Sequence, residues 1–173
     1  MDVRWLRNPA RERVTIMRKR IIPNRSETQA SSEGDWLDLE QFAEAEVTSE
    51  DPSYPIEDAL VRSSSSGWRA ADAGQQSIRL VFPNPRRVER VWLHFVEPDR
   101  ERTQQFVLRW SPDDGKTMNE VVRQQWNFHP QGSREEIENI HLGVTGVTLL
   151  ELLIIPDIGG GDARASIAKL RVK

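Results

Sequence analysis

Short runs in which apolar and polar residues alternate do most to constrain the fold of this chain. Residues 77–82 (SIRLVF) and 91–95 (VWLHF) each place every second side chain on one apolar face. A period of two is typical of strands with one buried face. Further candidate strands are 105–111, 118–128, 136–142, 146–155 and 166–172, and the predicted turns between strands include 83–85 (PNP), 113–115 (DDG), 130–132 (PQG) and 159–161 (GGG).

These patterns predict an all-β protein, an antiparallel β-sandwich of about eight strands. No candidate strand is followed by a long amphipathic helix, which disfavours α/β folds. Residues 149–155 are apolar at nearly every position, so we expect a central strand covered on both faces. Residues 36–45 (WLDLEQFAEA) suit a short helix or a first strand equally.

The first part of the chain differs in composition from the rest. Residues 1–30 carry eight Lys and Arg against three Asp and Glu, a net charge of +5, whereas the whole chain has a net charge of −3. Residues 23–35 are polar and rich in turn formers, which is typical of a linker. We therefore predict a basic N-terminal arm with its linker over 1–35 and one folded domain over 36–173.

The sequence leaves open what the arm does and where translation starts. Residues 14–22 could add a strand to a sheet edge, in this molecule or in a second copy. A basic segment also suits nucleic acid, but this one has neither RNA-binding aromatic motifs nor zinc-finger spacing, so we do not expect a nucleic-acid partner. Met17 is an alternative start of translation.

Several other classes of protein are disfavoured. No run of apolar residues approaches the roughly 18–20 needed to cross a bilayer, and the N-terminus lacks the apolar core of a secretory signal. We therefore expect no membrane partner and, by default, a cytoplasmic location. The chain has no Cys, which excludes disulfides, thiolate metal sites and a Cys nucleophile.

The sequence does not predict an enzyme or a cofactor. The three His residues lack zinc-site spacing, and the chain contains no P-loop, no G-x-G-x-x-G and no G-x-S-x-G motif. Carboxylates are numerous, but no pair is set apart for acid–base chemistry. No metal is expected from these patterns.

From residue 47 onward the order of motifs resembles the discoidin-like family, the coagulation-factor C-type or galactose-binding-like jelly roll. The resemblance rests on the segments VTSEDPSYPIEDAL, GWRAADAGQQSIRLVF, RTQQFVLRWSPDDGKT and ASIAKLRV. It implies a jelly roll and a non-catalytic module that holds a ligand, often a carbohydrate, in loops at one end of the sandwich. Members with a structural calcium commonly take ligands from an early acidic turn, here Asp58, and from a last-strand Glu. Lys169 stands at that second position, so the resemblance does not predict calcium binding here.

One candidate ligand site is the tract Trp126 to His129. An aromatic face can stack on a sugar ring, while the Asn127 amide and the His129 imidazole can bind its hydroxyls. The alternative is that Trp126 faces the core in register with Val122 and that His129 only caps a turn.

The polar stretch 97–103 (EPDRERT) supplies a second candidate. Arg102 offers a planar fork of donors for a ligand, with Glu97 and Asp99 beside it. The alternative is an internal ion pair between Arg102 and either carboxylate. Our function hypothesis is thus a carbohydrate-binding-like module that uses both tracts.

The rival hypothesis is a protein-interaction or assembly domain, with self-association through the arm. Trp92 and His94 alternate away from the apolar face of their strand, so we expect them to point outward. Such a pair is either a binding platform or a surface covered by the arm. Trp68, which follows the SSSSG run, is predicted to lie in the core.

Overall fold

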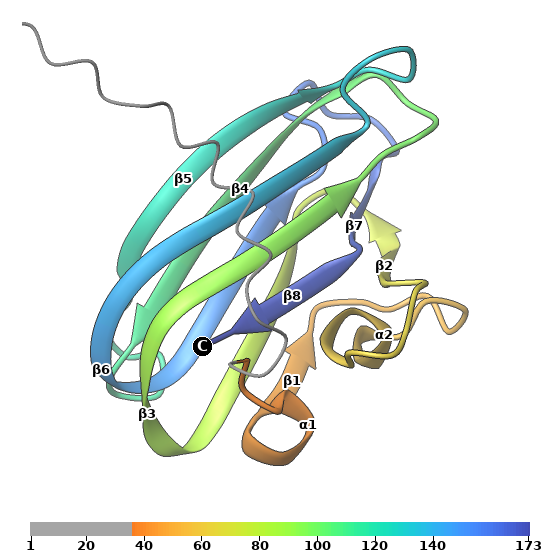
Figure 1. Cartoon of the computed structure of the whole chain (residues 1–173). Coiled ribbons are helices and arrows are strands. Elements are labelled where there is room, and N and C mark those ends of the chain that lie inside the picture. Colours follow the sequence, from red (N-terminus) through yellow and green to blue (C-terminus); the bar gives the residue numbers. More distant parts are fainter. Residues whose placement is uncertain (1–35) are drawn as a thin grey trace, which may run out of the picture. The chain divides into compact units, whose positions relative to one another are not determined.

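The computed structural model describes residues 36–173 as a sandwich of antiparallel strands with two short helices (Figure 1). The predicted all-β sandwich is therefore confirmed. The predicted arm and linker, and the segment 14–22 that could add a strand to a sheet edge, lie outside the described residues. In chain order the elements are α1 (Leu39–Phe42), β1 (Glu44–Val47), α2 (Ile56–Leu60), β2 (Trp68–Ala73), β3 (Gln76–Val96), β4 (Arg102–Ser111), β5 (Asn119–Phe128), β6 (Glu135–Ile155), β7 (Arg164–Ile167) and β8 (Lys169–Val172).

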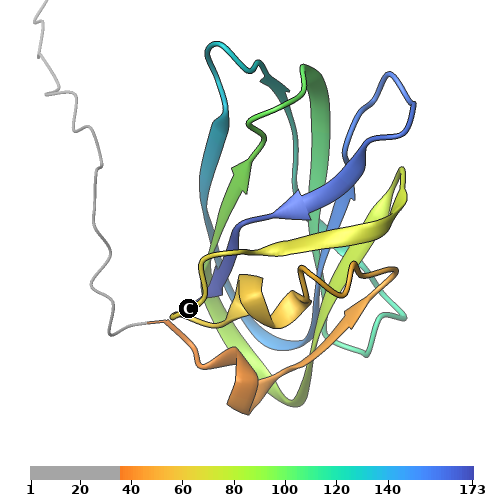
Figure 2. The same ribbon diagram turned by 90° about the vertical axis from the view of Figure 1, so that its right-hand side faces the viewer.

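Two long strands run through both layers of the sandwich. β3 and β6 each span 21 residues and pair with each other antiparallel along most of their length. At one end β1 pairs with β3 while β4 pairs with β6, and β5 extends the sheet beyond β4. At the other end β8 pairs with β3, and β2 pairs with β7 in a separate two-stranded sheet. Figures 1 and 2 show how β3 and β6 curve from one layer into the other.

The predicted turn at 83–85 is wrong, because these residues lie inside β3. The segment bends the strand without reversing it, and the pairing with β6 shifts register between Val81 and Arg86. Proline has no N–H to donate to a ladder, and unpaired positions at a bend tolerate it. Gly143 and Gly146, at φ +63° and +76°, provide the matching bend in β6 and join two strands that we had predicted as separate.

The core follows the predicted alternation. The apolar face of β3 (Ile78, Leu80 and Phe82, then Val91, Leu93 and Phe95) is buried throughout. The second half of β6 lies between β3 and β4, as expected for a central strand, and is covered on both faces. Trp68 is also buried in the core, which confirms the prediction made for it.

The two ends of the folded domain differ in detail from what the sequence predicted. Residues 36–45 form both a helix turn (α1) and the start of a strand (β1). The predicted last strand divides at Ala168, so that β7 pairs with β2 and β8 with β3. Within residues 36–173, no helix is long and apolar enough to span a membrane.

Candidate functional site

A polar pocket lies at the end of the sandwich where the β3–β4 and β6–β7 loops meet strand β2. Its volume is about 580 Å³. Residues from three parts of the chain line it, and their polar side chains are Arg69, Asp72, Glu97, Asp99, Arg100, Arg102, Asp162, Arg164 and Ser166. The rest of the lining consists of Ala, Val and Pro residues, with no aromatic ring. The pocket is thus suited to a ligand held by hydrogen bonds and charge.

Arg102 and Glu97 form the innermost part of the pocket. Arg102 faces inward at the start of β4, beside Phe128, and its side chain is 3% exposed. Its Nε lies 3.1 Å from Oε2 of Glu97, and its Nη1 donates to the carbonyl oxygen of Arg164 (3.0 Å). The internal ion-pair interpretation of Arg102 is therefore confirmed. Burial lowers the pKa of Arg102, although the charges of Glu97 and Asp157 act in the opposite direction.

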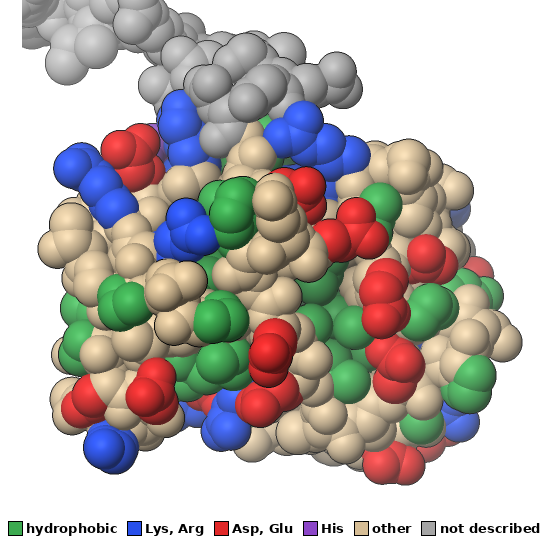
Figure 3. Space-filling view, turned by 90° about the horizontal axis from the view of Figure 1, so that it is seen from below, with side chains coloured by type: hydrophobic (Ala, Val, Ile, Leu, Met, Phe, Trp, Pro, Cys, Tyr) green, Lys and Arg blue, Asp and Glu red, His purple; other side chains and the backbone are tan. Residues whose placement is uncertain are grey.

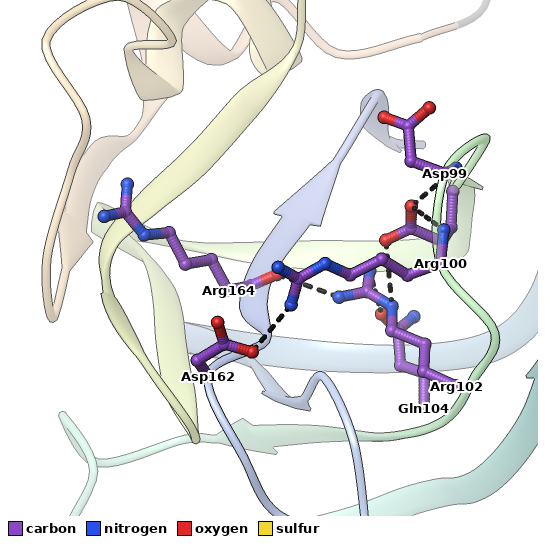
Figure 4. A network of polar contacts seen from close by, with 7 residues as sticks. Asp99, Arg100, Arg102, Gln104, Asp162 and Arg164 are labelled. Atoms are coloured by element: carbon purple, nitrogen blue, oxygen red, sulfur yellow. Dashed lines mark hydrogen bonds and ion pairs between the residues drawn. The ribbon is translucent and has the colours of Figure 1, made fainter.

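Arg100 crosses from the β3–β4 loop to the β6–β7 loop. Its Nη1 lies 2.7 Å from Oδ1 of Asp162, and the two side chains are 55% and 86% exposed (Figure 4). The hydrogen bond from Arg100, followed by its charge, lowers the pKa of Asp162. This contact is the one ion pair among the described residues that joins these two loops, and solvent reaches both partners.

Other charged groups of the pocket carry no strong partner within the described residues. The guanidinium of Arg69 stacks over the ring of Tyr54, 4.5 Å from its centroid. Arg164 turns its guanidinium away from Arg100 (Figure 4) and lies 3.7 Å from a carboxylate oxygen of Asp51. The carboxylate of Asp99 also points away from Arg100 (Figure 4), whereas its backbone N–H donates to Glu97.

The second predicted tract lies beside this pocket and does not line it. Asn127 accepts a hydrogen bond from the hydroxyl of Thr103 (2.7 Å) on the outer face of the sheet. His129 begins the β5–β6 loop, where its Nδ1 accepts from the Gln131 N–H and its Nε2 lies 3.8 Å from Glu101. The structure therefore brings Glu97, Asp99 and Arg102 into one site and leaves Asn127 and His129 at its margin.

Trp126 occupies a position between its two predicted alternatives. It pairs with Gln104, which is 2% exposed, so Trp126 points to the inner side of β5. Because β5 is the last strand of its sheet, the indole is still 37% exposed. It is neither a buried core residue nor part of the pocket.

Two carboxylates of β6 lie near the inner side of β5. With its amide nitrogen turned toward β6, Gln124 donates to both oxygens of Glu138 (3.1 and 2.8 Å). Burial, together with a hydrogen bond to Glu138 and its charge, raises the pKa of Glu136 to about 8. Glu136 therefore keeps its proton at neutral pH.

A second hollow, of about 530 Å³, lies on the outer face of the sheet, over β1, β3, β6 and β4. Glu151, 3% exposed, is held there by Arg79 (2.9 Å), Arg109 (2.6 Å) and the hydroxyl of Ser77 (3.0 Å). Burial acts to raise the pKa of Glu151, but these hydrogen bonds and charges outweigh it and lower the pKa. The network satisfies the buried carboxylate internally, as a structural ion cluster does.

Lys169 extends into the loop that follows α2. Its ammonium donates to the carbonyl oxygens of Asp58 (2.7 Å), Val61 (3.4 Å) and Ser64. Arg171 donates to the carbonyls of Ala59 and Leu60 in the same turn. Among the residues that the structure describes, no three His, Cys, Asp or Glu side chains gather as a metal site. A side-chain cation thus occupies the centre of this ring of carbonyls.

The outward orientation of Trp92 and His94 is confirmed. Their rings lie 5.7 Å apart on the face of β3 opposite the core, and His94 contacts Glu135 of β6 (3.3 Å). The end of the sandwich opposite the pocket shows hydrophobic side chains with both Asp or Glu and Lys or Arg side chains around them (Figure 3).

Comparison with known proteins gives a result only at the level of structure. No protein-family model matches the chain, and no curated protein matches it in sequence. The family 32 carbohydrate-binding module (CBM) of C. perfringens NanJ, solved with galactose, superimposes with a TM-score of 0.59 at 16% identity, covering 79% of this chain and 96% of that one. The fold is the galactose-binding-like jelly roll.

Two further structures with this jelly roll are similar to the same extent. The CBM32 of AlyQ, in complex with 4,5-unsaturated mannuronic acid, has a TM-score of 0.57 at 15% identity and covers 76% of this chain and 95% of that one. A pectin-binding CBM has a TM-score of 0.58 at 13% identity, with coverage of 77% and 91%. At these identities the jelly-roll likeness shows the fold alone.

Sequence reasoning missed half of the pocket. Arg69 and Asp72 lie in the segment WRAADA, and Asp162 and Arg164 in GGGDARAS. Each segment holds an Arg and an Asp two or three positions apart, which is a weak signal, since such residues are usually solvated. Only the tertiary structure gathers these residues: the pairing of β2 with β7 brings the two segments together, and the pairing of β4 with β6 places the β3–β4 loop beside them.

Proposed function

We propose that this domain is a non-catalytic carbohydrate-binding module whose ligand site is the polar pocket between the β3–β4 loop, the β6–β7 loop and β2. The observation that carries the proposal is the convergence of guanidinium and carboxylate groups in one pocket at the loop end of the jelly roll. Guanidinium N–H groups donate to sugar hydroxyls, and carboxylates accept from them, so neighbouring groups of both kinds suit a ring rich in hydroxyls.

The sequence and the structural neighbours support this proposal from separate directions. The discoidin-like order of motifs implies a ligand site in loops at one end of the sandwich. Galactose and unsaturated mannuronic acid are bound in two of the structural neighbours. The pocket is rigid at its base, because the buried Arg102–Glu97 pair fixes both ends of the β3–β4 loop. Such preorganisation lowers the entropic cost of binding.

A nuclear magnetic resonance titration with a panel of neutral and acidic sugars tests the proposal. Binding in the pocket should shift the backbone amides of residues 69–73, 97–102 and 162–166. Asp72→Asn should weaken this binding, whereas Glu46→Gln, in the hollow on the outer sheet face, should not. The proposal is wrong if no sugar of the panel shifts the pocket amides, or if the shifts cluster around Glu46 instead.

A further inference from the structure

We propose that the pocket selects an anionic sugar, a uronate residue, whose carboxylate binds Arg100 in the place that Asp162 now occupies. This inference rests on the proposed function and names the class of sugar that the pocket takes. Asp162 then acts as an internal competitor of the ligand.

The contact between Arg100 and Asp162 already shows the geometry of such a complex. Asp162 reaches Arg100 from a Gly-rich loop and presents a carboxylate 86% exposed to solvent. The 2.7 Å distance to Nη1 is that of a charge-assisted hydrogen bond. A carboxylate arriving from solvent can form the same bond without any rearrangement of the buried residues below.

With Asp162 displaced, the pocket is lined by four guanidinium groups and three carboxylates, so one positive charge is left for an anion. The guanidinium groups of Arg69, Arg100 and Arg102 line the same pocket. Burial is the main cause that lowers the pKa of Arg102, and the charges of Arg100 and Arg69 act in the same direction. Glu97 is already paired with Arg102, and the carboxylate of Asp99 points away from Arg100 (Figure 4). Once Asp162 is displaced, Arg100 has no direct carboxylate partner among the described residues.

The lining also indicates a charged sugar. A neutral sugar is commonly held by stacking on an aromatic ring as well as by hydrogen bonds, and no aromatic side chain lines this pocket. Binding energy must therefore come from polar groups. A uronate adds to the hydroxyls a carboxylate that the planar fork of Arg100 can bind through two N–H groups.

If Asp162 competes with the sugar carboxylate for Arg100, substitutions of Asp162 and of Arg100 should change the affinity for an acidic sugar in opposite directions. Asp162→Asn should raise the affinity for an acidic sugar about two- to fivefold, because an exposed pair of this kind contributes up to about a fivefold factor. Arg100→Gln should lower the same affinity by about fivefold or more. If the pair only braced the two loops, both substitutions would change affinity in the same direction.

Calorimetric titrations with oligogalacturonate and oligomannuronate, each beside its methyl ester, provide the test with the full chain. The ester keeps the ring and its hydroxyls and replaces the charged carboxylate by a neutral methyl ester. Matched controls are Glu120→Gln and Arg123→Gln, which break an exposed pair (2.8 Å) on β5 and should leave all affinities unchanged.

The inference is supported if an acid form binds more tightly than its ester and the two substitutions act in opposite directions on the acid form alone. It is overturned if the esters or galactose bind as tightly as the acids, or if both substitutions weaken binding equally, and the proposed function then stands. If neither acidic nor neutral sugars bind, the proposed function fails together with it.

Discussion

Nε of Arg102 lies 3.1 Å from Oε2 of Glu97, and the two side chains are only 3% and 12% exposed. The pair closes the end of the core directly beneath the pocket. Glu97 and Arg102 stand at the two ends of the β3–β4 loop. Their ion pair therefore affects both the stability of the fold and the shape of the pocket.

Replacing Arg102 by Met should strongly destabilise the domain. Removal of one partner leaves Glu97 as an uncompensated, nearly buried charge, which typically costs about 3 kcal/mol or more in free energy of unfolding. Urea denaturation measures this loss. Arg123→Met, which breaks an exposed pair, should cost less than about 1 kcal/mol. Equal costs for the two variants would contradict a structural role of the Arg102–Glu97 pair.

Lys169→Met should also destabilise the fold. The substitution keeps an apolar chain of similar length but removes the ammonium that binds the carbonyls of Asp58, Val61 and Ser64. Loss of these charge-assisted bonds should cost about 1–3 kcal/mol in urea denaturation. Lys116→Met, at an exposed position, serves as the control and should have little effect. Identical unfolding curves for both variants would show that the ammonium does not stabilise the loop.

Calcium should not raise the melting temperature of the wild-type protein. The Lys169 ammonium repels a divalent cation from the carbonyls it contacts, and hard cations need about six to eight oxygen ligands. A ligand at a hundredfold excess over its dissociation constant would add about 2.7 kcal/mol to the free energy of unfolding. Differential scanning calorimetry with millimolar calcium, followed by chelator, decides the question, and a reversible rise in melting temperature would refute the prediction.

The stability of the domain should fall as pH rises from about 4.5 to about 8 because of Glu136. In the folded state its pKa is raised to about 8, whereas in the unfolded chain it is near 4.5. The folded state thus holds more protons across this window, so stability is greatest below it and is lost as pH passes the folded pKa.

Glu136→Gln should flatten that part of the pH profile, as measured by urea denaturation at several pH values. Glu40→Gln, which changes an exposed carboxylate of α1, should leave the slope as it is in the wild type. An unchanged slope in Glu136→Gln would mean that Glu136 is ionised in the folded protein throughout the window.

Trp126→Ala should cost clearly less stability than Trp68→Ala. Truncation of a fully buried aromatic residue costs about 3–5 kcal/mol, and Trp68 is 1% exposed whereas Trp126 is 37% exposed. Because Trp126 does not line the pocket, its removal should also leave sugar affinity unchanged. Thermal unfolding and calorimetric titration measure the two effects, and a loss of affinity would extend the site to the edge of β5.

The sequence alone determined the layer architecture and the membership of the core. The alternation of apolar and polar residues already predicts which side chains of 77–82 and 91–95 are buried, because successive side chains of a strand point to opposite faces. It also indicated Trp68 as a core residue and Trp92 and His94 as outward. The order of motifs from residue 47 onward indicated the jelly roll.

Only the tertiary structure decided how strands continue and which loops meet. Whether 83–85 reverses or merely bends the chain depends on pairing with β6, some 60 residues away, which no local signal encodes. The same holds for the site: Arg100 and Asp162 are 62 positions apart and meet because β4 pairs with β6, which places the loop before β4 beside the loop after β6. Charged residues in loops look alike in a sequence, and the packing of the strands between them determines which of them become partners.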